Sequence, residues 1–442
     1  MTSPRWISSP TLEGPCKSHL AVSWVFLIFF LRWGTRYDHG NSRIRDSLLD
    51  FAVEKLLCAD PHPESLTPAQ TYAVLSQRLA LDINTPQYLF ASTSPLETMY
   101  KMHEQVANHM RVCVAVGDGV ESLRAIASSE PILSEAASQI MRHVPTFSLP
   151  GALSTILSGF CINQGDRGEL LVAAFFTWAR DQAVREISDD NLCHYFSVEY
   201  LLKHLFSETT FNSMSAHMPS LCHSKDAQQP FSEVLKKTNM HFNHFIKPQK
   251  RQLLARQYLT LYMARGAAAL GANCQPGFDA VYPYLYDTIK FDPKKVGFVI
   301  VQVKNDSNPS RSTADDIFSA MDPFTCGLLD NSDLEDGIFP IPIIRFVFSL
   351  SHGTPEVTRR EPNMGSMSQK FTSYDYLCKG VSADILRPVG QSPEGWAALV
   401  NKSDPWDSFY NVTVPDVLRA QLPGCGTAEG HWDHWVKSGF IW

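Results

Sequence analysis

The pattern of hydrophobic and polar positions divides the chain into a helical first part and a second part rich in strands. Over residues 46–160, apolar residues recur at helical spacing in segments such as TPAQTYAVLSQRLAL and SEPILSEAASQIMRH. Ser129 stands ahead of Pro131 and is the predicted N-cap of the second of these helices. One short β-like piece, MRVCVAV, interrupts the helical pattern. We therefore predict a mainly helical region over residues 46–160, preceded by an irregular N-terminal segment, residues 1–45.

The second region, predicted over residues 161–395, begins with the helix GDRGELLVAAFFTWARDQAV, whose apolar residues occupy nearly every side. Such a helix is typical of a position buried inside a domain. FDAVYPYLY at 278–286 and VGFVIVQVKN at 296–305 are predicted strands, joined by a turn long enough for a loose antiparallel hairpin. The capped helix STADDIFSAM and the strand IPIIRFVFSLS follow. This order of elements predicts an α/β fold with a mixed sheet, followed by a C-terminal extension, residues 396–442.

The strand VGFVIVQVKN carries polar residues on one face. Alternate residues of a strand share a face, so one face holds Val299, Val301 and Val303. The other face holds Phe298, Ile300, Gln302 and Lys304. The valines fill a core, and the polar pair reaches the end of the strand, where it can meet a cleft.

Asp279 opens the neighbouring strand and lies across from this pair if the two strands are hairpin partners. A carboxylate, an amide oxygen and a lysine at one strand end can hold a hard divalent cation and orient a water molecule for attack on phosphorus. Lys304 would stabilise the incoming hydroxide and the charge that develops on phosphorus. This is the chemistry of phosphodiester hydrolysis.

Glu169, on the first helix of the second region, has two interpretations. Asp166 and Glu169 have the spacing of a capping box, with Asp166 as N-cap and Glu169 as the acceptor three residues later. Alternatively, Glu169 belongs to the metal site, a role that only a family resemblance of the chain implies. His241 and His244 lack a third ligand nearby, so we expect core or groove histidines there.

Composition excludes several classes of protein. A chain of 442 residues, 44% hydrophobic and 19% charged, can form two compact units with flanking segments. No P-loop and no GxSxG motif occurs, which excludes a P-loop nucleotide site and the commonest serine hydrolase. Ten cysteines without CxxC or zinc-finger spacing indicate buried thiols in a reducing compartment, so we expect an intracellular protein, nuclear or cytoplasmic.

The apolar run LAVSWVFLIFFL, residues 20–31, has 12 residues, where a membrane-spanning helix needs about 20. Arg5 and Lys17 precede it as in a signal peptide, but no small-residue cleavage site follows. We predict that it does not span a membrane, and a membrane-anchored protein is the least favoured hypothesis.

The charge distribution is uneven. The formal net charge is −7, yet Val234 to Phe278 contains no Asp or Glu. That basic block holds Lys236, Lys237, Lys247, Lys250, Arg251, Arg256 and Arg265. A basic patch beside the proposed cleft would suit a phosphate backbone, and a solvated helix face is the alternative. The segment from Ser312 to Ile344 is acidic and contains no Lys or Arg. We expect it to lie away from nucleic acid or to act as a loop that competes with nucleic acid for the binding groove.

GFD followed by QVK, with Glu169 far upstream, resembles the PD-(D/E)XK nuclease fold, a restriction-endonuclease-like mixed sheet flanked by helices. The combination GDRGELL, FNHFIK, MARGAA, GANCQPGFD and VQVKN resembles a group of proteins of mushroom-forming fungi related to the nuclease domains of Crinkler-type effectors and mobile elements. The resemblance covers about residues 100–390.

The resemblance implies a DNA-cleaving site formed by Glu169, Asp279, Gln302 and Lys304. It implies that Asp279, Glu169 and Gln302 hold Mg²⁺ or Mn²⁺, and that the partner is nucleic acid, in the first place duplex DNA. Gln302 departs from the pattern, which usually has Glu or Asp there, and the amide removes a negative charge from the metal site. The alternative is therefore an inactive nuclease fold that serves as a nucleic-acid or protein interaction module.

Overall fold

The structure is a computed structural model, and it describes residues 42–59, 61–81, 95–116, 123–158, 164–187, 195–224, 227–272, 275–305, 313–335, 341–351, 353–361 and 370–401. The chain divides into two compact units, Met1–Leu48 and Leu49–Trp442. The apolar run at residues 20–31 lies outside the described residues. Among the helices that the structure describes, none has the length and apolar character needed to cross a membrane.

The helical region is built from α2 (Ser42–Leu57), α3 (Pro68–Leu79), α4 (Pro95–Asn108), α5 (Pro131–His143) and α6 (Leu149–Ser158). Strands β1 (Arg111–Val116) and β2 (Leu123–Ala127) form an antiparallel pair. The predicted helices and the β-like piece are thus present. The predicted N-cap Ser129 is wrong, because α5 begins after Glu130, and the Ser129 hydroxyl instead lies 2.8 Å from His244 Nε2.

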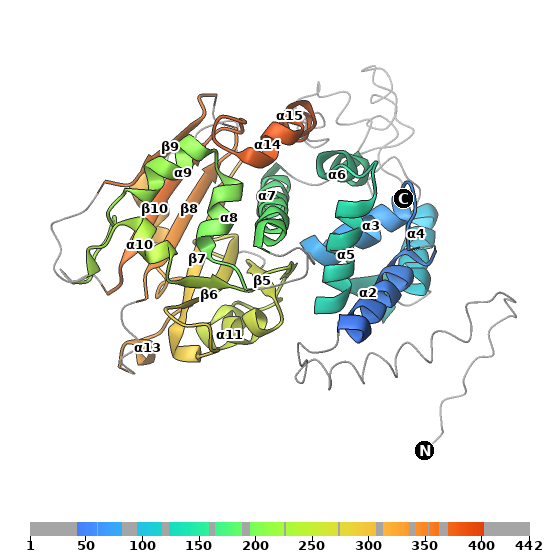
Figure 1. The fold of residues 1–442 in the computed structure, drawn as a ribbon, viewed down its shortest axis with the longest axis horizontal. Coiled ribbons are helices and arrows are strands. Elements are labelled where there is room, and N and C mark those ends of the chain that lie inside the picture. The colour runs from blue at the N-terminus through green and yellow to red at the C-terminus, as the bar shows by residue number, and fades with distance from the viewer. Residues whose placement is uncertain are drawn as a thin grey trace, which may run out of the picture. The chain divides into compact units, whose positions relative to one another are not determined.

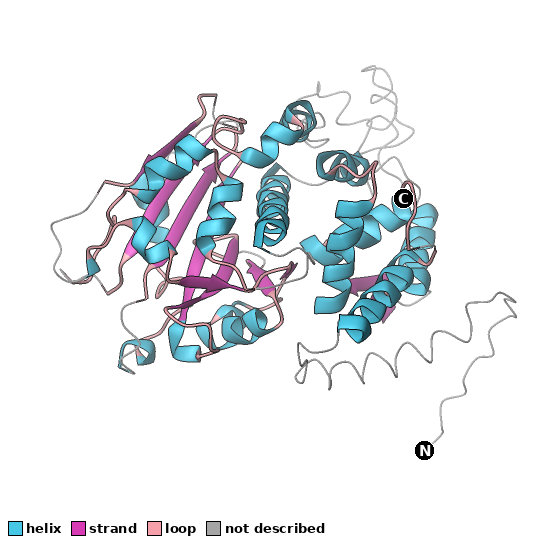
Figure 2. Cartoon of the chain, in the orientation of Figure 1, coloured by secondary structure: helices cyan, strands magenta, loops and turns pink. Residues whose placement is uncertain are grey.

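A mixed sheet forms the centre of the second region (Figures 1 and 2). The described strands are β3 (Thr238–Met240), β4 (His244–Ile246), β5 (Ala267–Leu270), β6 (Ala280–Tyr286), β7 (Val296–Lys304), β8 (Ile343–Ser349), β9 (Glu356–Arg359) and β10 (Ser373–Lys379). Their order is β4-β5-β6-β7-β8-β10-β9, with β3 also paired to β6. Strands β6 and β7 form the predicted antiparallel hairpin, and β7, β8 and β10 run parallel. The predicted α/β class with a mixed sheet is confirmed.

Helices surround this sheet. They are α7 (Gln164–Ile187), α8 (Val198–Leu205), α9 (Glu208–Ser215), α10 (Phe231–Leu235), α11 (Arg256–Ala264), α12 (Ala314–Ala320), α13 (Ser332–Glu335), α14 (Arg387–Gln391) and α15 (Pro393–Asn401), with short 3₁₀ turns η3 (Arg251–Leu254) and η4 (Pro293–Lys295). Figure 1 shows α7 between the sheet and helices of the helical region. Phe175 and Phe176 on α7 are fully buried, and the Phe176 ring stacks on Tyr282 of β6 with centroids 4.5 Å apart.

The two faces of β7 enter two different hydrophobic clusters. Val299, Val301 and Val303 pack in the cluster that contains the buried residues of α7. Phe298 and Ile300 pack in a second cluster with residues of α11 and α12. The alternation predicted for this strand is therefore confirmed, and both of its faces are covered up to Val303.

Candidate functional site

Strand directions bring the candidate residues to one edge of the sheet. Strands β4, β5, β7 and β8 run in one direction, and β6 runs against them. The carboxyl ends of the four strands therefore meet where β6 begins. Asp279 immediately precedes β6 and Lys304 ends β7, so both lie at this edge, which we call the site edge.

Asp279 and Gln302 are in direct contact. One carboxylate oxygen of Asp279, Oδ2, accepts a hydrogen bond from Gln302 Nε2 at 2.7 Å and another from the backbone N–H of Val303 at 2.6 Å. The backbone of Asp279 is also fixed, since its N–H donates to Val301 O at 2.8 Å and its carbonyl accepts from Gly271 N at 2.6 Å. The side chain is thus held by the strand that carries Gln302 and Lys304.

Glu169 lies close enough to interact electrostatically with the residues of the site edge. Helix α7 begins at Gln164, so Asp166 lies inside its first turn and is not the N-cap. The capping-box interpretation of Glu169 is therefore wrong. Burial and the charges of Asp279 and Asp166 raise the pKa of Glu169 to about 7, and the charges of Lys247 and Lys304 oppose this rise.

Gly168 allows α7 to approach the site edge. A Cβ atom at this position would lie 2.7 Å from Asn305 Cβ and 3.2 Å from Val303 Cγ1, closer than side chains normally pack. Asn305 is buried, and its side-chain oxygen accepts a hydrogen bond from Ser351 Oγ at 3.0 Å. Sequence reasoning missed both residues. The available signal was a glycine next to Glu169 in a helix interior, where glycine is otherwise unfavourable.

The acidic groups suit a cation. Burial and the charge of Asp166 raise the pKa of Asp279 to about 6, although the Val303 N–H and the Lys304 charge lower it. The carboxylates of Asp279 and Glu169 supply hard oxygen ligands of the kind that Mg²⁺ and Mn²⁺ prefer. Gln302 offers an amide oxygen only if its amide rotates, because its nitrogen faces Asp279. No cluster of three or more His, Cys, Asp or Glu side chains suited to a metal is found within the described ranges.

Lys247 of the basic block directly follows β4 at the site edge, and Lys250 and Arg251 come three and four residues after it. The charge of Lys247 acts on Glu169, as noted above. Lys236 and Lys237 lie elsewhere, because the Lys237 carbonyl accepts a hydrogen bond from the N–H of Asp287, which follows the far end of β6. The basic block is therefore split between the two edges of the sheet.

The remaining two basic residues are held by protein groups. Arg256 is buried, forms an ion pair with Asp333 at 3.2 Å and donates to the carbonyl of Pro293 at 2.7 Å. Arg265 donates to the carbonyl of Ser129 and lies 3.7 Å from a carboxylate oxygen of Glu130. Both have structural contacts that account for their positions.

The other candidate chemistry is that of His244 and of the described cysteines. His244 is buried, and its ring nitrogens contact Asn243 Oδ1 at 2.5 Å and Ser129 Oγ at 2.8 Å. Burial lowers its pKa to about 3, so it is the core histidine that we expected. Cys326 and Cys378 are buried free thiols, whereas Cys58 and Cys113 are exposed, which corrects the expectation that the cysteines are buried.

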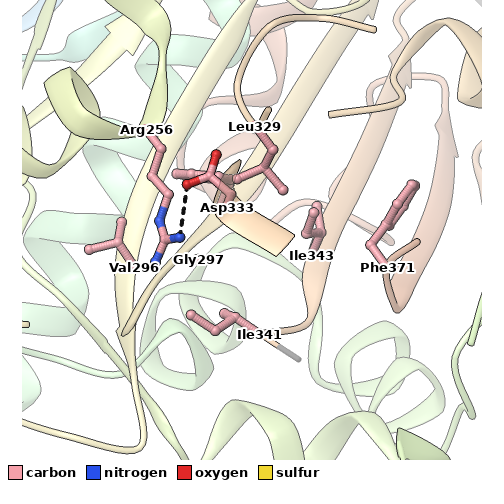
Figure 3. Close-up of a pocket in the computed structure, with 9 residues that line it drawn as sticks. Arg256, Val296, Gly297, Leu329, Asp333, Ile341, Ile343 and Phe371 are labelled. Atoms are coloured by element: carbon pink, nitrogen blue, oxygen red, sulfur yellow. Dashed lines mark hydrogen bonds and ion pairs between the residues drawn. The ribbon is translucent and has the colours of Figure 1, made fainter. Parts of the chain in front are cut away.

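A cavity of about 20 Å³ lies at the start of β7, at the opposite end of that strand from Lys304 (Figure 3). It is lined by Arg256, Val296, Gly297, Phe298, Leu329, Asp333, Ile341, Ile343 and Phe371. This volume holds about one water molecule, which is too small for a substrate.

The fold and the site edge define an α/β protein with a carboxylate, an amide and a lysine on adjacent strands and a second carboxylate on α7. The chain matches, over residues 64–353, the protein family described as Domain of unknown function (DUF8736), and it belongs to that family. No curated protein and no solved structure matches the chain. The matched residues extend from the segment before α3 through β8, so the family domain includes part of the helical region together with the site edge.

Proposed function

We propose that the chain is a PD-(D/E)XK-type nuclease that hydrolyses phosphodiester bonds of DNA with Mg²⁺ or Mn²⁺. The observation that carries the proposal is the contact of Asp279 with Gln302 at the strand end that presents Lys304, with Glu169 within electrostatic range. The sequence resemblance to restriction-endonuclease-like proteins supports it. Duplex DNA, cut without strong sequence preference, is the proposed substrate.

Each residue has a proposed role. Asp279 and Glu169 would hold the cation, which would supply the positive charge that activates a water molecule for attack on phosphorus. Gln302 orients Asp279 by its hydrogen bond to Oδ2. The ammonium of Lys304, which makes no hydrogen bond or ion pair with a described residue, stabilises the attacking hydroxide and the charge on phosphorus.

Free buried thiols at Cys326 and Cys378 support the intracellular location, nuclear or cytoplasmic, that we propose with this function.

The second candidate is an inactive nuclease fold that binds nucleic acid or protein. It is favoured by one feature of the site: the Gln302 amide donates a hydrogen bond to the carboxylate that would have to bind the metal. An amide in this position satisfies Asp279 without a cation.

Plasmid nicking with Mg²⁺, Mn²⁺ or EDTA tests the proposal. We expect metal-dependent nicking by the parent and a loss on the order of 10²-fold in rate for Lys304→Ala, because the transition-state charge is no longer stabilised. Lys294→Ala is the matched control, since Lys294 is exposed on η4 just before the opposite end of the same strand. Gln302→Glu should tighten binding of Mg²⁺ because it adds a carboxylate to the metal site.

If neither the parent nor the Gln302→Glu protein nicks DNA with either metal, the proposed nuclease activity is wrong and the interaction module is the candidate that is left. A Lys304→Ala protein that nicks as fast as the parent would remove the proposed role of Lys304.

A further inference from the structure

Three cations at the site edge are exposed and have no partner among the residues that the structure describes. The side chains of Lys247, Lys250 and Arg251 form no hydrogen bond or ion pair with any residue that the structure describes, and all three are exposed. In contrast, Lys236 forms an ion pair with Glu233 at 2.8 Å, and Arg256 and Arg265 contact acidic residues as described above. Lys247, Lys250 and Arg251 are thus the members of the basic block available to an anionic ligand at this edge.

Two observations position Lys247 and Arg251 on the side of the carboxylates, and Lys250 directly precedes Arg251 in the chain. Lys247 directly follows β4, which runs parallel to β5 and ends at the site edge, and its charge acts on Glu169. The charge of Arg251 acts on the Cys326 thiol. Cys326 packs against Gly277, where a Cβ atom would lie 2.5 Å from Cys326 Sγ, and Gly277 is two residues before Asp279.

We propose that Lys247, Lys250 and Arg251, here called the edge track, hold the phosphate backbone of the substrate, and that Lys247 contacts the phosphate next to the one attacked. This inference rests on the proposed function. The chain from Lys247 to Arg251 spans at most about 14 Å when fully extended, so the edge track covers a few consecutive phosphates. Contacts of this type position the backbone and carry no base information, as expected for cleavage without strong sequence preference.

The far edge of the sheet supplies a matched control. Lys236 and Lys237 are consecutive in the same basic block, but they lie beside Asp287, beyond the end of β6. The seven residues of β6 separate them from Asp279 by roughly 24 Å at about 3.4 Å per residue. A backbone seated on the edge track therefore does not require them.

Fluorescence anisotropy with a labelled duplex, in Ca²⁺ to prevent cleavage, measures the binding. For the triple variant Lys247→Gln, Lys250→Gln and Arg251→Gln we expect at least tenfold weaker binding at low salt. The slope of log affinity against log salt should fall by up to about 2.7, since each lost phosphate contact removes about 0.9. Lys236→Gln with Lys237→Gln should change affinity less than twofold. Circular dichroism and the melting temperature of each variant check that it is folded.

Lys247→Ala tests whether Lys247 contributes to the cleavage step in addition to DNA binding, unlike the other residues of the edge track. In the nicking assay it should raise KM and lower kcat, and Lys247→Arg should restore most of the activity because a cation is retained. Lys250→Ala should raise KM alone, since its phosphate lies farther from the reaction.

The outcomes distinguish the edge track from the proposed function. If the parent protein binds duplex DNA through these residues but never nicks it, the proposed nuclease activity is wrong and the proposed role of the edge track is supported. If the parent nicks DNA and the triple variant binds DNA as tightly as the parent does, the proposed role of the edge track is wrong and the proposed nuclease activity is supported. A parent that does not bind DNA, or one weakened equally by the Lys236 and Lys237 control, also overturns the track.

Discussion

Glu169 carries a carboxyl group whose charged form is disfavoured in the folded protein. Burial and the charges of Asp279 and Asp166 raise its pKa to about 7, against about 4.3 for a free glutamate. The folded state therefore binds a proton more tightly than the unfolded chain does. The contribution of this group to stability is fully present below about pH 4 and is lost as the pH rises through 7.

Glu169→Gln should therefore stabilise the metal-free protein at pH 8, on the order of 1–3 kcal/mol in the free energy of unfolding, and change it little at pH 4. Urea denaturation in EDTA at the two pH values measures this. Glu54→Gln, at an exposed position of α2, is the control and should have a small effect at both. A Glu169→Gln protein that is less stable than the parent at pH 8 would contradict the electrostatic account of this site.

At the residue scale, sequence predicted the contacts that depend on strand periodicity. Alternation assigns Gln302 and Lys304 to one face, and a hairpin places Asp279 opposite them, so two local rules suffice. Glu169 needed more. Its apparent capping box was wrong because α7 starts at Gln164, before Asp166. The position of Glu169 also depends on its neighbour Gly168, which lies close to Asn305. Asn305 is 137 positions later in the chain, and a local sequence pattern cannot predict such a contact.

At the scale of elements, the packing of α7 on β7 depends on the absence of a side chain at Gly168. Gly168→Ala should cost about 1–3 kcal/mol of stability, because the new methyl group would meet the buried Asn305 and Val303. Displacing α7 should also move Glu169 away from Asp279 and slow any metal-dependent nicking. Thermal and urea denaturation measure the stability change.

Gly151→Ala provides a control of opposite sign. Gly151 also lies within a helix, α6, but a Cβ there would meet nothing closer than Ser148 Cβ at 3.6 Å, an ordinary contact. Alanine should stabilise that helix by about 0.5–1 kcal/mol. Equal effects of the two substitutions would show that the contact of Gly168 with Asn305 does not restrict α7.

The elements that sequence missed are those whose strand character comes from neighbours. Strand β5 reads AAAL, and alanine has little preference for strands, but it pairs with β4 on one side and β6 on the other. Strand β10 contains the buried Asp375, which looks like a loop residue in sequence. Its carboxylate pairs with Arg345 of β8 at 2.5 Å, which makes the burial acceptable.

At the scale of the whole molecule, buried ion pairs cross the predicted boundary between residues 160 and 161. Arg78 of α3 pairs with Asp181 of α7 at 2.8 Å, and its Nε donates to the carbonyl of Asn243 at 2.6 Å. Arg180 pairs with Glu135 of α5 at 2.9 Å and donates to the carbonyl of Phe242 at 2.9 Å. The arginines therefore tie the helical region to the segment between β3 and β4, which leads to the edge track.

If these contacts make the helical region and the sheet one cooperative unit, Arg78→Met should cost about 3–5 kcal/mol in the free energy of unfolding. The reason is that Asp181 stays buried and loses a bidentate partner, while the Asn243 carbonyl loses a donor. Lys203→Met, which removes the more exposed ion pair with Glu199 on α8, should cost about 1 kcal/mol or less. Urea unfolding followed by both circular dichroism and tryptophan fluorescence makes the measurement. A loss below about 1 kcal/mol for Arg78→Met, or two separated transitions in the parent protein, would instead mean that the regions on either side of residue 160 fold independently.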